Sequence, residues 1–403
     1  MNPPAQAVTQ AVTQAPAQAP AQAAEPMRIV YLGDANSVHL RRWAGYFADR
    51  GHEIHFLVPD NDTISVPADP RFAMHRFRAW PAGRIRGASS LTTWRSLARV
   101  LREIDPDVLH SHAVTRYGLA AWLSRFRPYA ITVWGSDVLI VPRISRRRRI
   151  YTWLALHGAA VVTGGSETLV RAAVAAGARP SRSHYVHFGA DLDRFCPGPA
   201  PAELRTRLGL DGHRVLFSPR TIAPLYRQDV VVDALANLPP DVVLLMTRHG
   251  AQPAELARIE ARAAALGLSD RVRVVPGVAH AEMPDFYRLA DVVVSVPVSD
   301  GGPNTVVEAL ASGRPIVASD LPANREWLGD LDPTSLVPVG DATATAQALM
   351  TILGRPEGER AELARRGRAA VEERADQRAT MAEIERLYRE LASRRRRRRP
   401  RGR

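Results

Sequence analysis

Short, almost entirely apolar segments alternate with longer amphipathic segments through most of the chain, and this alternation constrains the fold more than any other feature. In the first half the apolar segments are MRIVYLGD, EIHFLV, DVLHSH, AITVWG and AAVVTGG, and helical periodicity follows them. A short strand without alternating polar positions is buried on both faces, as in a parallel sheet covered by helices. We therefore predict an α/β fold with a Rossmann-like N-terminal domain at residues 27–198.

The pattern restarts after a Gly- and Pro-rich linker, HFGADLDRFCPGPAP. Six further apolar segments follow, with helical stretches between them: HRVLFSPR, DVVLLMTRH, RVRVVPG, DVVVSVP, RPIVASD and SLVPVG. They predict a second doubly wound parallel-sheet domain at residues 199–372. A helix at 373–392 is expected to return to the N-terminal domain. Ligands of such folds bind in the cleft at the carboxyl ends of the strands.

The two ends of the chain differ in composition from the rest. Residues 1–26 are rich in Ala, Gln and Pro and lack the basic start and apolar core of a secretory signal, so we expect a disordered tail. The basic tail at 393–403 is expected to stay solvated. No run of about eighteen apolar residues occurs, so no membrane span is expected.

The charged and reactive residues exclude several classes of chemistry. All 54 basic residues are arginine, so a Walker-type phosphate loop and a lysine Schiff base are excluded, and a catalytic cation has to be Arg or His. The single cysteine, Cys196, excludes a disulfide framework and a multi-cysteine metal cluster, which fits a reducing cytoplasm. The net charge of +13 favours phosphorylated substrates, anionic lipid or nucleic acid as partners.

The stretch SDGGPNTVVEALASG, at residues 299–313, has the strongest functional pattern. Its Gly-Gly-Pro turn lets the backbone approach a ligand, and the amides at the start of the following helix favour phosphate. Asp300 precedes the turn and Glu308 lies in the helix, so one acid can face the sugar of a ligand and the other the ribose of a nucleotide. A capped helix with two solvated acids is the alternative reading.

This stretch resembles the signature of the retaining glycosyltransferases of family 4, which have the two-domain GT-B fold. That signature is an acid, seven residues, a Glu and then Ala-Met-Ala-x-Gly-x-Pro-Val, and this chain has Asp300, Glu308 and ALASGRPIVASD. The resemblance covers most of residues 27–390. It implies that Asp300 contacts the transferred sugar and that Glu308 holds the ribose hydroxyls. It also implies donor-binding backbone between these acids, at Gly301, Gly302, Pro303, Asn304 and Thr305. Asp300 stands where the family usually has Glu, which leaves the donor sugar open.

Further residues expected to contact the donor lie directly after predicted strands of the C-terminal domain. The family pattern is Arg, four residues and Lys-Gly, with both cations on the donor diphosphate, and this chain has SPRTIAPLYRQD. Arg220 matches the Arg, the Lys-Gly is missing, and Arg227 is the candidate for the second charge. A fixed guanidinium can stabilise the charge that develops on a departing diphosphate. The resemblance places the nucleotide base against Pro276, Gly277 and Val278.

The histidines of DVLHSHAVTRYG are candidates from the N-terminal domain. We predict that His110 and His112 point to opposite faces of the strand end, with His112 nearer the cleft and His110 structural. The resemblance places one such imidazole near the transferred sugar. In the neighbouring TVWGSD, Trp134 replaces the usual His. Asp137 contacts an acceptor hydroxyl or His112, or it is a structural cap.

The loop in YLGDANSVH resembles the loop of the family that approaches the reactive phosphate and the acceptor. Its candidate binding residues are Gly33, Asn36 and Ser37. It is not G-x-G-x-x-G, which disfavours a dinucleotide cofactor.

These expectations combine into a metal-independent retaining glycosyltransferase with no cofactor other than its nucleotide-sugar co-substrate. It would move a hexose or N-acetylhexosamine from a UDP- or GDP-linked sugar to an acceptor hydroxyl, in envelope glycan or glycolipid assembly. The alternatives are glycosylation of a small secondary metabolite and a nucleotide-sugar epimerase of the same fold.

Two arginine clusters, Arg143–Arg149 and Arg394–Arg399, bear on partners and location. Solvated charge and attraction to anionic lipid are both compatible with them. A nucleic-acid-binding protein is less favoured, because the clusters lack interleaved aromatics and no recognisable binding module is present, so no specific nucleic acid is expected. We predict a cytoplasmic protein with peripheral association at the inner face of the membrane.

Overall fold

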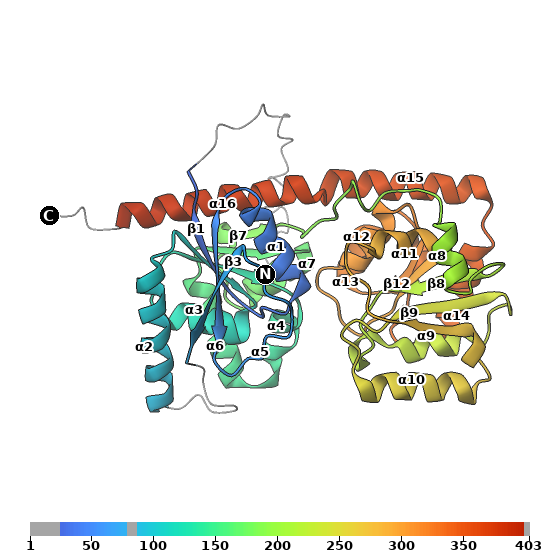
Figure 1. The fold of residues 1–403 in the computed structure, drawn as a ribbon, viewed down its shortest axis with the longest axis horizontal. Coiled ribbons are helices and arrows are strands. Elements are labelled where there is room, and N and C mark those ends of the chain that lie inside the picture. The colour runs from blue at the N-terminus through green and yellow to red at the C-terminus, as the bar shows by residue number, and fades with distance from the viewer. Residues whose placement is uncertain (1–24, 79–86, 399–403) are drawn as a thin grey trace, which may run out of the picture.

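The computed structural model describes residues 25–78 and 87–398 and shows two α/β domains side by side (Figure 1). Every strand pairing within the two sheets is parallel, and the predicted fold class is confirmed. The strand orders are β3-β2-β1-β4-β5-β6-β7 and β10-β9-β8-β11-β12-β13. The order reverses between β1 and β4 and between β8 and β11. Loops diverge at such switch points and leave a crevice for a ligand.

The N-terminal sheet contains two strands that the apolar pattern does not predict. Its strands are β1 (Arg28–Leu32), β2 (Glu53–Pro59), β3 (Phe72–Phe77), β4 (Val108–His112), β5 (Tyr129–Val133), β6 (Val161–Gly164) and β7 (Ser183–Tyr185). The unpredicted strands, β3 and β7, are the two edges. The interior of β3 is half exposed or exposed and β7 is very short, so neither contains a continuous apolar run.

The helices of the N-terminal domain cover both faces of this sheet. They are α1 (Val38–Ala48), α2 (Gly87–Ile104), α3 (Leu119–Leu123), α4 (Ser136–Leu139), α5 (Val141–Ile144), α6 (Arg146–Gly158) and α7 (Glu167–Ala175), with a π-helical turn η1 (Val114–Gly118) after β4. In α1 the buried residues Leu40, Trp43 and Phe47 recur at helical spacing and face the core.

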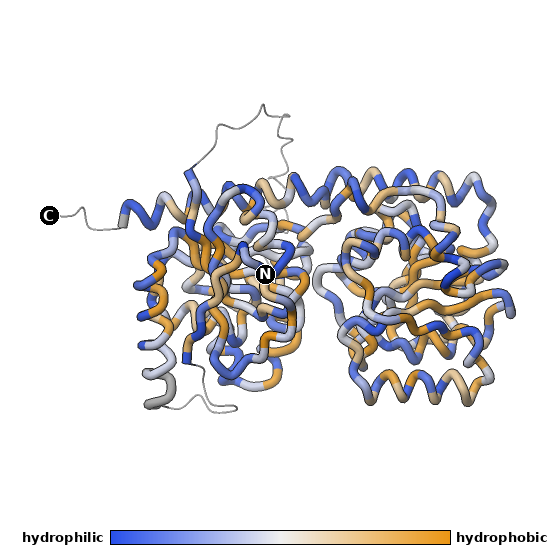
Figure 2. The backbone as a smooth tube through the Cα atoms, viewed as in Figure 1, coloured by the Kyte–Doolittle hydropathy of each residue, from blue (hydrophilic) through white to orange (hydrophobic). Residues whose placement is uncertain are grey.

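The six strands of the C-terminal sheet coincide with the six predicted apolar segments. They are β8 (Arg214–Ser218), β9 (Val242–Thr247), β10 (Val272–Val275), β11 (Val292–Ser295), β12 (Ile316–Ser319) and β13 (Leu336–Val337). The accompanying helices are α8 (Ala202–Arg207), α9 (Gln228–Leu235), α10 (Pro253–Ala265), α11 (Met283–Leu289), α12 (Asn304–Ala311), α13 (Pro322–Leu328) and α14 (Ala342–Leu353). Apolar residues concentrate along the central strands of both domains (Figure 2).

Two long helices run along one side of both domains. Helix α15 (Glu357–Arg374) lies on the C-terminal domain, and α16 (Gln377–Arg398) lies on the N-terminal domain (Figure 1). The apolar residues of α16 recur at helical spacing and join the core around Trp43, and they are Met381, Ile384, Leu387, Tyr388 and Leu391. The end of the chain is thereby tied to its beginning.

The start of the basic C-terminal stretch differs from the expected solvated tail, because it continues α16 as far as Arg398. Arg395 pairs with Asp105 at 2.7 Å and lies over the ring of Phe126. Arg396 pairs with Glu25 at 2.8 Å. Acidic residues of the N-terminal domain therefore neutralise part of this cluster. Residues 1–24 and 399–403 of the two predicted tails lie outside the described residues.

The hydroxyl of Tyr388 joins α16 to the N-terminal sheet. It accepts a hydrogen bond from the Trp43 indole N–H at 3.1 Å and bonds to His110 Nδ1. We expect Tyr388→Phe to lower the free energy of unfolding by about 1–3 kcal/mol, because two buried polar groups lose their partner. Urea denaturation measures this, with Tyr151→Phe on α6 as the control. Equal losses in both variants would contradict the role of the buried network.

Within the described ranges, no helix is long and apolar enough to cross a membrane.

Candidate active site

The first cluster of predicted site residues lies at the start of α12. The Arg220 guanidinium, which follows β8, is 3.0 Å from Asp300 Oδ2 and donates to Thr305 Oγ1 at 3.2 Å. The ring of Tyr226 lies 4.3 Å below the same guanidinium. Three neighbours therefore hold the Arg220 cation in place beside the N-terminal amides of α12. A fixed cation next to helix amides is suited to phosphate oxygens.

The second cluster surrounds Glu308, one helical turn after Thr305. The Tyr287 hydroxyl donates to Oε2 at 2.9 Å, and His280 Nε2 lies 3.3 Å from Oε1. Arg42 of α1, in the other domain, lies 3.9 Å from Oε1. Burial raises the pKa of Glu308, but its bonds and charge interactions with these three residues outweigh burial, so the pKa lies below its ordinary value. The carboxylate is ionised at neutral pH and can accept hydrogen bonds from hydroxyls.

Asp300 and Glu308 have no partner in common among the described residues. Asp300 is paired with Arg220, whereas Glu308 is bound by His280, Tyr287 and Arg42. Asp300 thus lies in the turn before α12 and Glu308 lies within α12, each with its own partners. Their roles toward a ligand stay a prediction. The neighbours of Glu308 come from two segments that are distant from it in sequence, residues 280–287 and helix α1, so no local sequence pattern could have indicated them.

The turn before α12 is also where the two domains touch. The Ser166 hydroxyl of the N-terminal domain donates to the Gly301 carbonyl at 2.6 Å. Close by, the carboxylate of Glu326 accepts hydrogen bonds from the backbone of Glu167 and Thr168 at 3.0 and 2.9 Å. A side chain of α13 thus caps α7 from across the cleft. The two domains therefore contact each other at the edge of the candidate site.

Gly301 permits this contact because a side chain would collide with the other domain. A Cβ at Gly301 would lie 2.8 Å from the Gly135 Cα and 2.7 Å from Leu169 Cδ2. At the adjacent Gly302 the nearest atom, Gly165 Cα, would be 3.7 Å away, an ordinary contact. The sequence interpretation assigns these glycines to ligand approach alone, and it misses their part in domain contact.

We expect Gly301→Ala to lower turnover roughly tenfold while leaving the melting temperature of the protein nearly unchanged. The added methyl group opposes the closed arrangement of the domains, and overpacking of this kind costs about 1–3 kcal/mol. Steady-state kinetics and thermal unfolding test this. The comparison variant Gly302→Ala has room for its methyl group and should lose less activity. Equal losses would exclude steric obstruction by the Gly301 methyl group as the cause.

His110 and His112 lie on the same side of β4, so the prediction of opposite faces is wrong. Side chains alternate along a strand, and positions i and i+2 share a face. The two rings are 4.4 Å apart. His110 bonds to Tyr388 and to Thr132 Oγ1, which is a structural role.

His112 has neither ring nitrogen bonded within the described part of the chain, although it is buried beside Trp43 and Trp134. Burial, followed by the nearby His110 and His39, lowers the pKa of His112 well below its ordinary value, so the ring is neutral. A neutral imidazole has one donor and one acceptor, and both are suited to a sugar hydroxyl. Its role at the transferred sugar stays a prediction.

The predicted acceptor loops have clear structural functions. Asn36 donates to the Thr63 carbonyl at 2.8 Å, and the hydroxyl of Ser37 caps α1. A Cβ at Gly33 would lie 2.6 Å from Leu40 Cδ2, so a side chain there would displace the Leu40 side chain. Asp137 accepts from the backbone N–H groups of Val114, Trp134 and Gly135, which matches the structural-cap alternative. Burial raises the pKa of Asp137 although these bonds lower it.

The remaining predicted donor contacts lie apart from the Arg220 pair. The guanidinium of Arg227 is bound to Asp229 at 3.0 Å and lies against Gly340. The backbone of Arg227 is left-handed, with φ of 50°. Pro276, Gly277 and Val278 follow β10, and Gly277 lies against His249. Tyr226, not Arg227, contacts Arg220.

Two further histidines near the site were not predicted from the sequence. His39 stacks on Trp134, and His187 lies edge-on to Trp327 of the C-terminal domain. Burial lowers the pKa of each to about 4, so both are neutral. A sequence signal existed only for His39, which lies in the first helical turn after the predicted Asn36 and Ser37.

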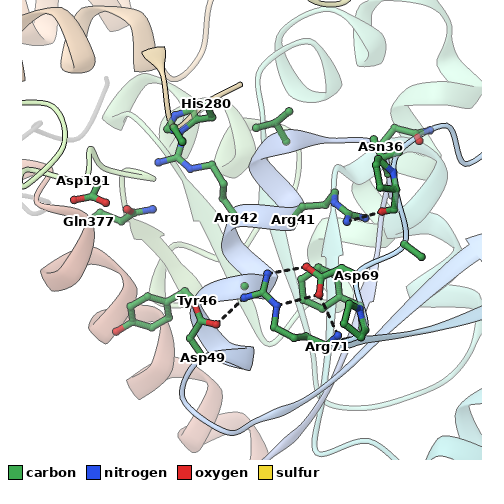
Figure 3. Close-up of a pocket in the computed structure, with 18 of the residues that line it drawn as sticks. Asn36, Arg41, Arg42, Tyr46, Asp49, Asp69, Arg71, Asp191, His280 and Gln377 are labelled. Carbon is green, nitrogen blue, oxygen red and sulfur yellow. Dashed lines mark hydrogen bonds and ion pairs between the residues drawn. The ribbon is translucent and has the colours of Figure 1, made fainter. Parts of the chain in front are cut away.

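An open pocket of about 710 Å³ borders the Glu308 cluster (Figure 3). Helix α1 supplies one wall with Arg41, Arg42 and Tyr46, and His280 lies near Arg42 at the rim (Figure 3). Arg71 on the opposite wall is already held by Asp49 and Asp69. The lining combines arginines with Asp49, Asp69 and Asp191, which suits a polar ligand. Among the described residues, no group of three or more His, Cys, Asp and Glu side chains is placed to hold a metal ion.

Comparison with known families gives two matches that together span both domains. Residues 28–164 match the family described as glycosyl transferase 4-like, and residues 202–370 match glycosyl transferases group 1. A D-inositol 3-phosphate glycosyltransferase of Xylanimonas cellulosilytica is 37% identical over 203 residues, 48% of each chain. One from Streptomyces bingchenggensis is 34% identical over 156 residues, 36% of this chain and 34% of its own. The chain therefore spans about half the length, or less, of these curated relatives.

Solved structures show the same fold at low sequence identity. Anabaena HepE in complex with UDP and glucose has a TM-score of 0.73 at 20% identity, over 90% of this chain and 99% of its own. Sucrose-phosphate synthase from Thermosynechococcus elongatus has a TM-score of 0.73 at 21% identity, over 91% and 99%.

Proposed function

Because this chain belongs to the glycosyl transferases group 1 family and has the GT-B fold, we propose that it is a retaining glycosyltransferase with a nucleotide-diphosphate sugar as donor. One observation carries the proposal: α12 presents two separate anchoring points. Arg220 with Asp300 lies at its start, and the ionised Glu308 lies one turn along it. This order suits a ligand with sugar and diphosphate at one end and ribose at the other.

In the proposed reaction, the bond between the anomeric carbon and the donor phosphate breaks, and its electron pair leaves with the nucleoside diphosphate. The acceptor oxygen bonds to the same face of that carbon. The acceptor proton passes to an oxygen of the departing phosphate, so no carboxylate has to act as the nucleophile. Arg220 and the first amides of α12 stabilise the developing charge without a metal. His112 and Asp300 hold hydroxyls of the transferred sugar.

The donor we propose is a UDP- or GDP-linked hexose or N-acetylhexosamine. UDP is supported by the solved complex of HepE with UDP-glucose. The acceptor we propose is a hydroxyl of a lipid-linked envelope glycan, and the alternative acceptor is a small secondary metabolite. Several relatives are named for a phosphorylated polyol, and Arg41 and Arg42 of the pocket beside Glu308 suit such a group. We also propose a cytoplasmic location at the inner face of the membrane.

A panel of nucleotide sugars tests the donor. We expect one UDP- or GDP-sugar to raise the melting temperature through binding to the native state. Incubation of that donor with candidate acceptors, with and without a chelator, should release nucleoside diphosphate and give a product whose anomeric configuration by NMR is that of the donor. Inverted configuration would exclude a retaining enzyme. An isomerised donor in the absence of acceptor would select the epimerase alternative.

A further inference from the structure

An exposed basic and apolar face on the N-terminal domain has no part in the site described above. It is formed by α5 and the first two turns of α6, where residues 143–150 form an unbroken exposed run. In Figure 1 these helices lie on the side of the domain away from α16. Helix α4, which joins this face to Gly135 and the site, is directly before α5. The face is therefore continuous in the chain with the loop that touches Gly301.

Four arginines of this face have no acidic partner among the described residues. No Asp or Glu occurs between residues 138 and 166. In the described ranges, no ion pair involves Arg143, Arg146, Arg148 or Arg149. On the exposed surface of α15, by contrast, Arg360 and Arg365 each pair with a glutamate of their own helix. The charge of these four arginines is thus available to an anionic partner.

Large apolar side chains are interspersed with these arginines. Ile144 and Ile150 are each 55% exposed, Trp153 is 46% exposed and Ile140 is 41% exposed. Four positions, Arg146, Arg149, Ile150 and Trp153, recur at i, i+3, i+4 and i+7 and therefore share one side of α6. That side lines an open groove of about 770 Å³, whose other wall is formed by Ala172 and Ala175 of α7 and by Ala176 directly after it.

We propose that this face docks on an anionic lipid bilayer. Its arginines would contact headgroup phosphates, and its isoleucines and Trp153 would enter the interfacial layer, as in other basic amphipathic surfaces. A nucleic acid would use the arginines but would leave the three exposed isoleucines against a charged backbone. Taken with the proposed function, docking through α5 and α6 holds the Gly135 loop near the bilayer and favours a lipid-linked acceptor over a soluble one.

Sedimentation of the full chain with vesicles tests the surface. We expect binding to vesicles containing phosphatidylglycerol and little binding to phosphatidylcholine alone. Removal of three arginines in R143Q/R146Q/R149Q should lower partition roughly a hundredfold, since each basic residue near an anionic surface contributes about fivefold. The matched control R360Q/R365Q/R366Q removes the same charge from α15 and should bind like the original protein. Equal losses in the two triple variants would overturn the assignment of this face.

The apolar part of the surface has its own test. I144S/I150S should weaken vesicle binding while the arginines remain, and phosphatidylglycerol vesicles should shift the tryptophan emission of the original protein but not that of W153F. Unchanged binding and emission in these variants would overturn insertion. Tighter, salt-sensitive binding to RNA or DNA than to vesicles, abolished in R143Q/R146Q/R149Q, would select nucleic acid instead.

The two proposals can fail independently. Nucleoside diphosphate binding is measured without vesicles and should be the same in all these variants, since none of the substituted residues contacts the candidate active site. Vesicle binding without any nucleotide binding would preserve the docking surface and reject the enzyme. Nucleotide binding without vesicle binding would preserve the enzyme and reject the docking surface.

Discussion

Arg220→Ala should lower kcat by about 10²–10³-fold at saturating donor, the loss typical of removing one preorganised group that stabilises developing charge. Arg220 is the basic residue that contacts both Asp300 and the first turn of α12. Its removal leaves the helix amides to stabilise the departing diphosphate alone. The effect should be larger on kcat than on KM, because the charge on the leaving phosphate is greatest in the transition state.

Three further variants separate this role from a general loss of charge. Arg220→Lys keeps a cation but not the planar fork that reaches two partners, so we expect only partial activity. Arg248→Ala removes an exposed arginine that pairs only loosely with Glu260 and should be neutral. Arg227→Ala tests whether Arg227 supplies the second positive charge for the diphosphate. The Arg227 guanidinium is already paired with Asp229. Lower turnover in this variant would assign that role to Arg227, and unchanged turnover would reject it. Unchanged turnover in Arg220→Ala, with the fold intact, would reject the proposed reaction.

Most strands that could be predicted contain a long apolar run, because a strand buried on both faces is apolar along most of its length. Every residue of β9, β11 and β12 is buried, and every residue of β8 except Arg214 is buried. The edge strand β10 is half-buried, but its three valines were enough to predict it. The edge strands β3 and β7 face solvent on one side and contain polar residues, so their pattern is not distinguishable from a loop. Helix α16 is predictable as a helix, but its extension to Arg398 depends on acids such as Asp105 that are remote in sequence.

In the candidate site, too, some residues are indicated by the local sequence and others only by contacts between remote segments. Asp300 and Glu308 are indicated by the local pattern and Arg220 by the resemblance to the family, and the structure brings Asp300 and Arg220 together. The residues that fix the ionisation of Glu308 are Tyr287, His280 and Arg42, and they meet only when the chain has folded. The contact of Gly301 with Gly135 likewise depends on the placement of one domain against the other. The error at His110 and His112 was one of strand geometry, and the sequence itself contained the information to avoid it.

Glu308→Gln should raise the Kd for nucleoside diphosphate by about 10–10²-fold, because each hydrogen bond to a charged group contributes about 1.5–3 kcal/mol. The amide keeps the shape of the side chain but has only one acceptor oxygen. It also leaves the half-buried Arg42 without the carboxylate that lies 3.9 Å away. Calorimetric titration with UDP and GDP measures the Kd, and denaturation of the same variant separates lost binding from lost fold.

The pH dependence of binding provides an independent check on Glu308. Because the folded pKa of this carboxyl lies below its ordinary value, the contribution of Glu308 to stability is complete above the unfolded pKa and is lost as the pH falls through the folded pKa. Nucleotide affinity should therefore persist down to the ordinary glutamate range and decline only below it. Tyr287→Phe removes the 2.9 Å hydrogen bond, which should move that decline to higher pH, while Glu308→Gln should abolish it. A decline that is the same in all three proteins would show that another group titrates, and that Glu308 does not hold the ribose.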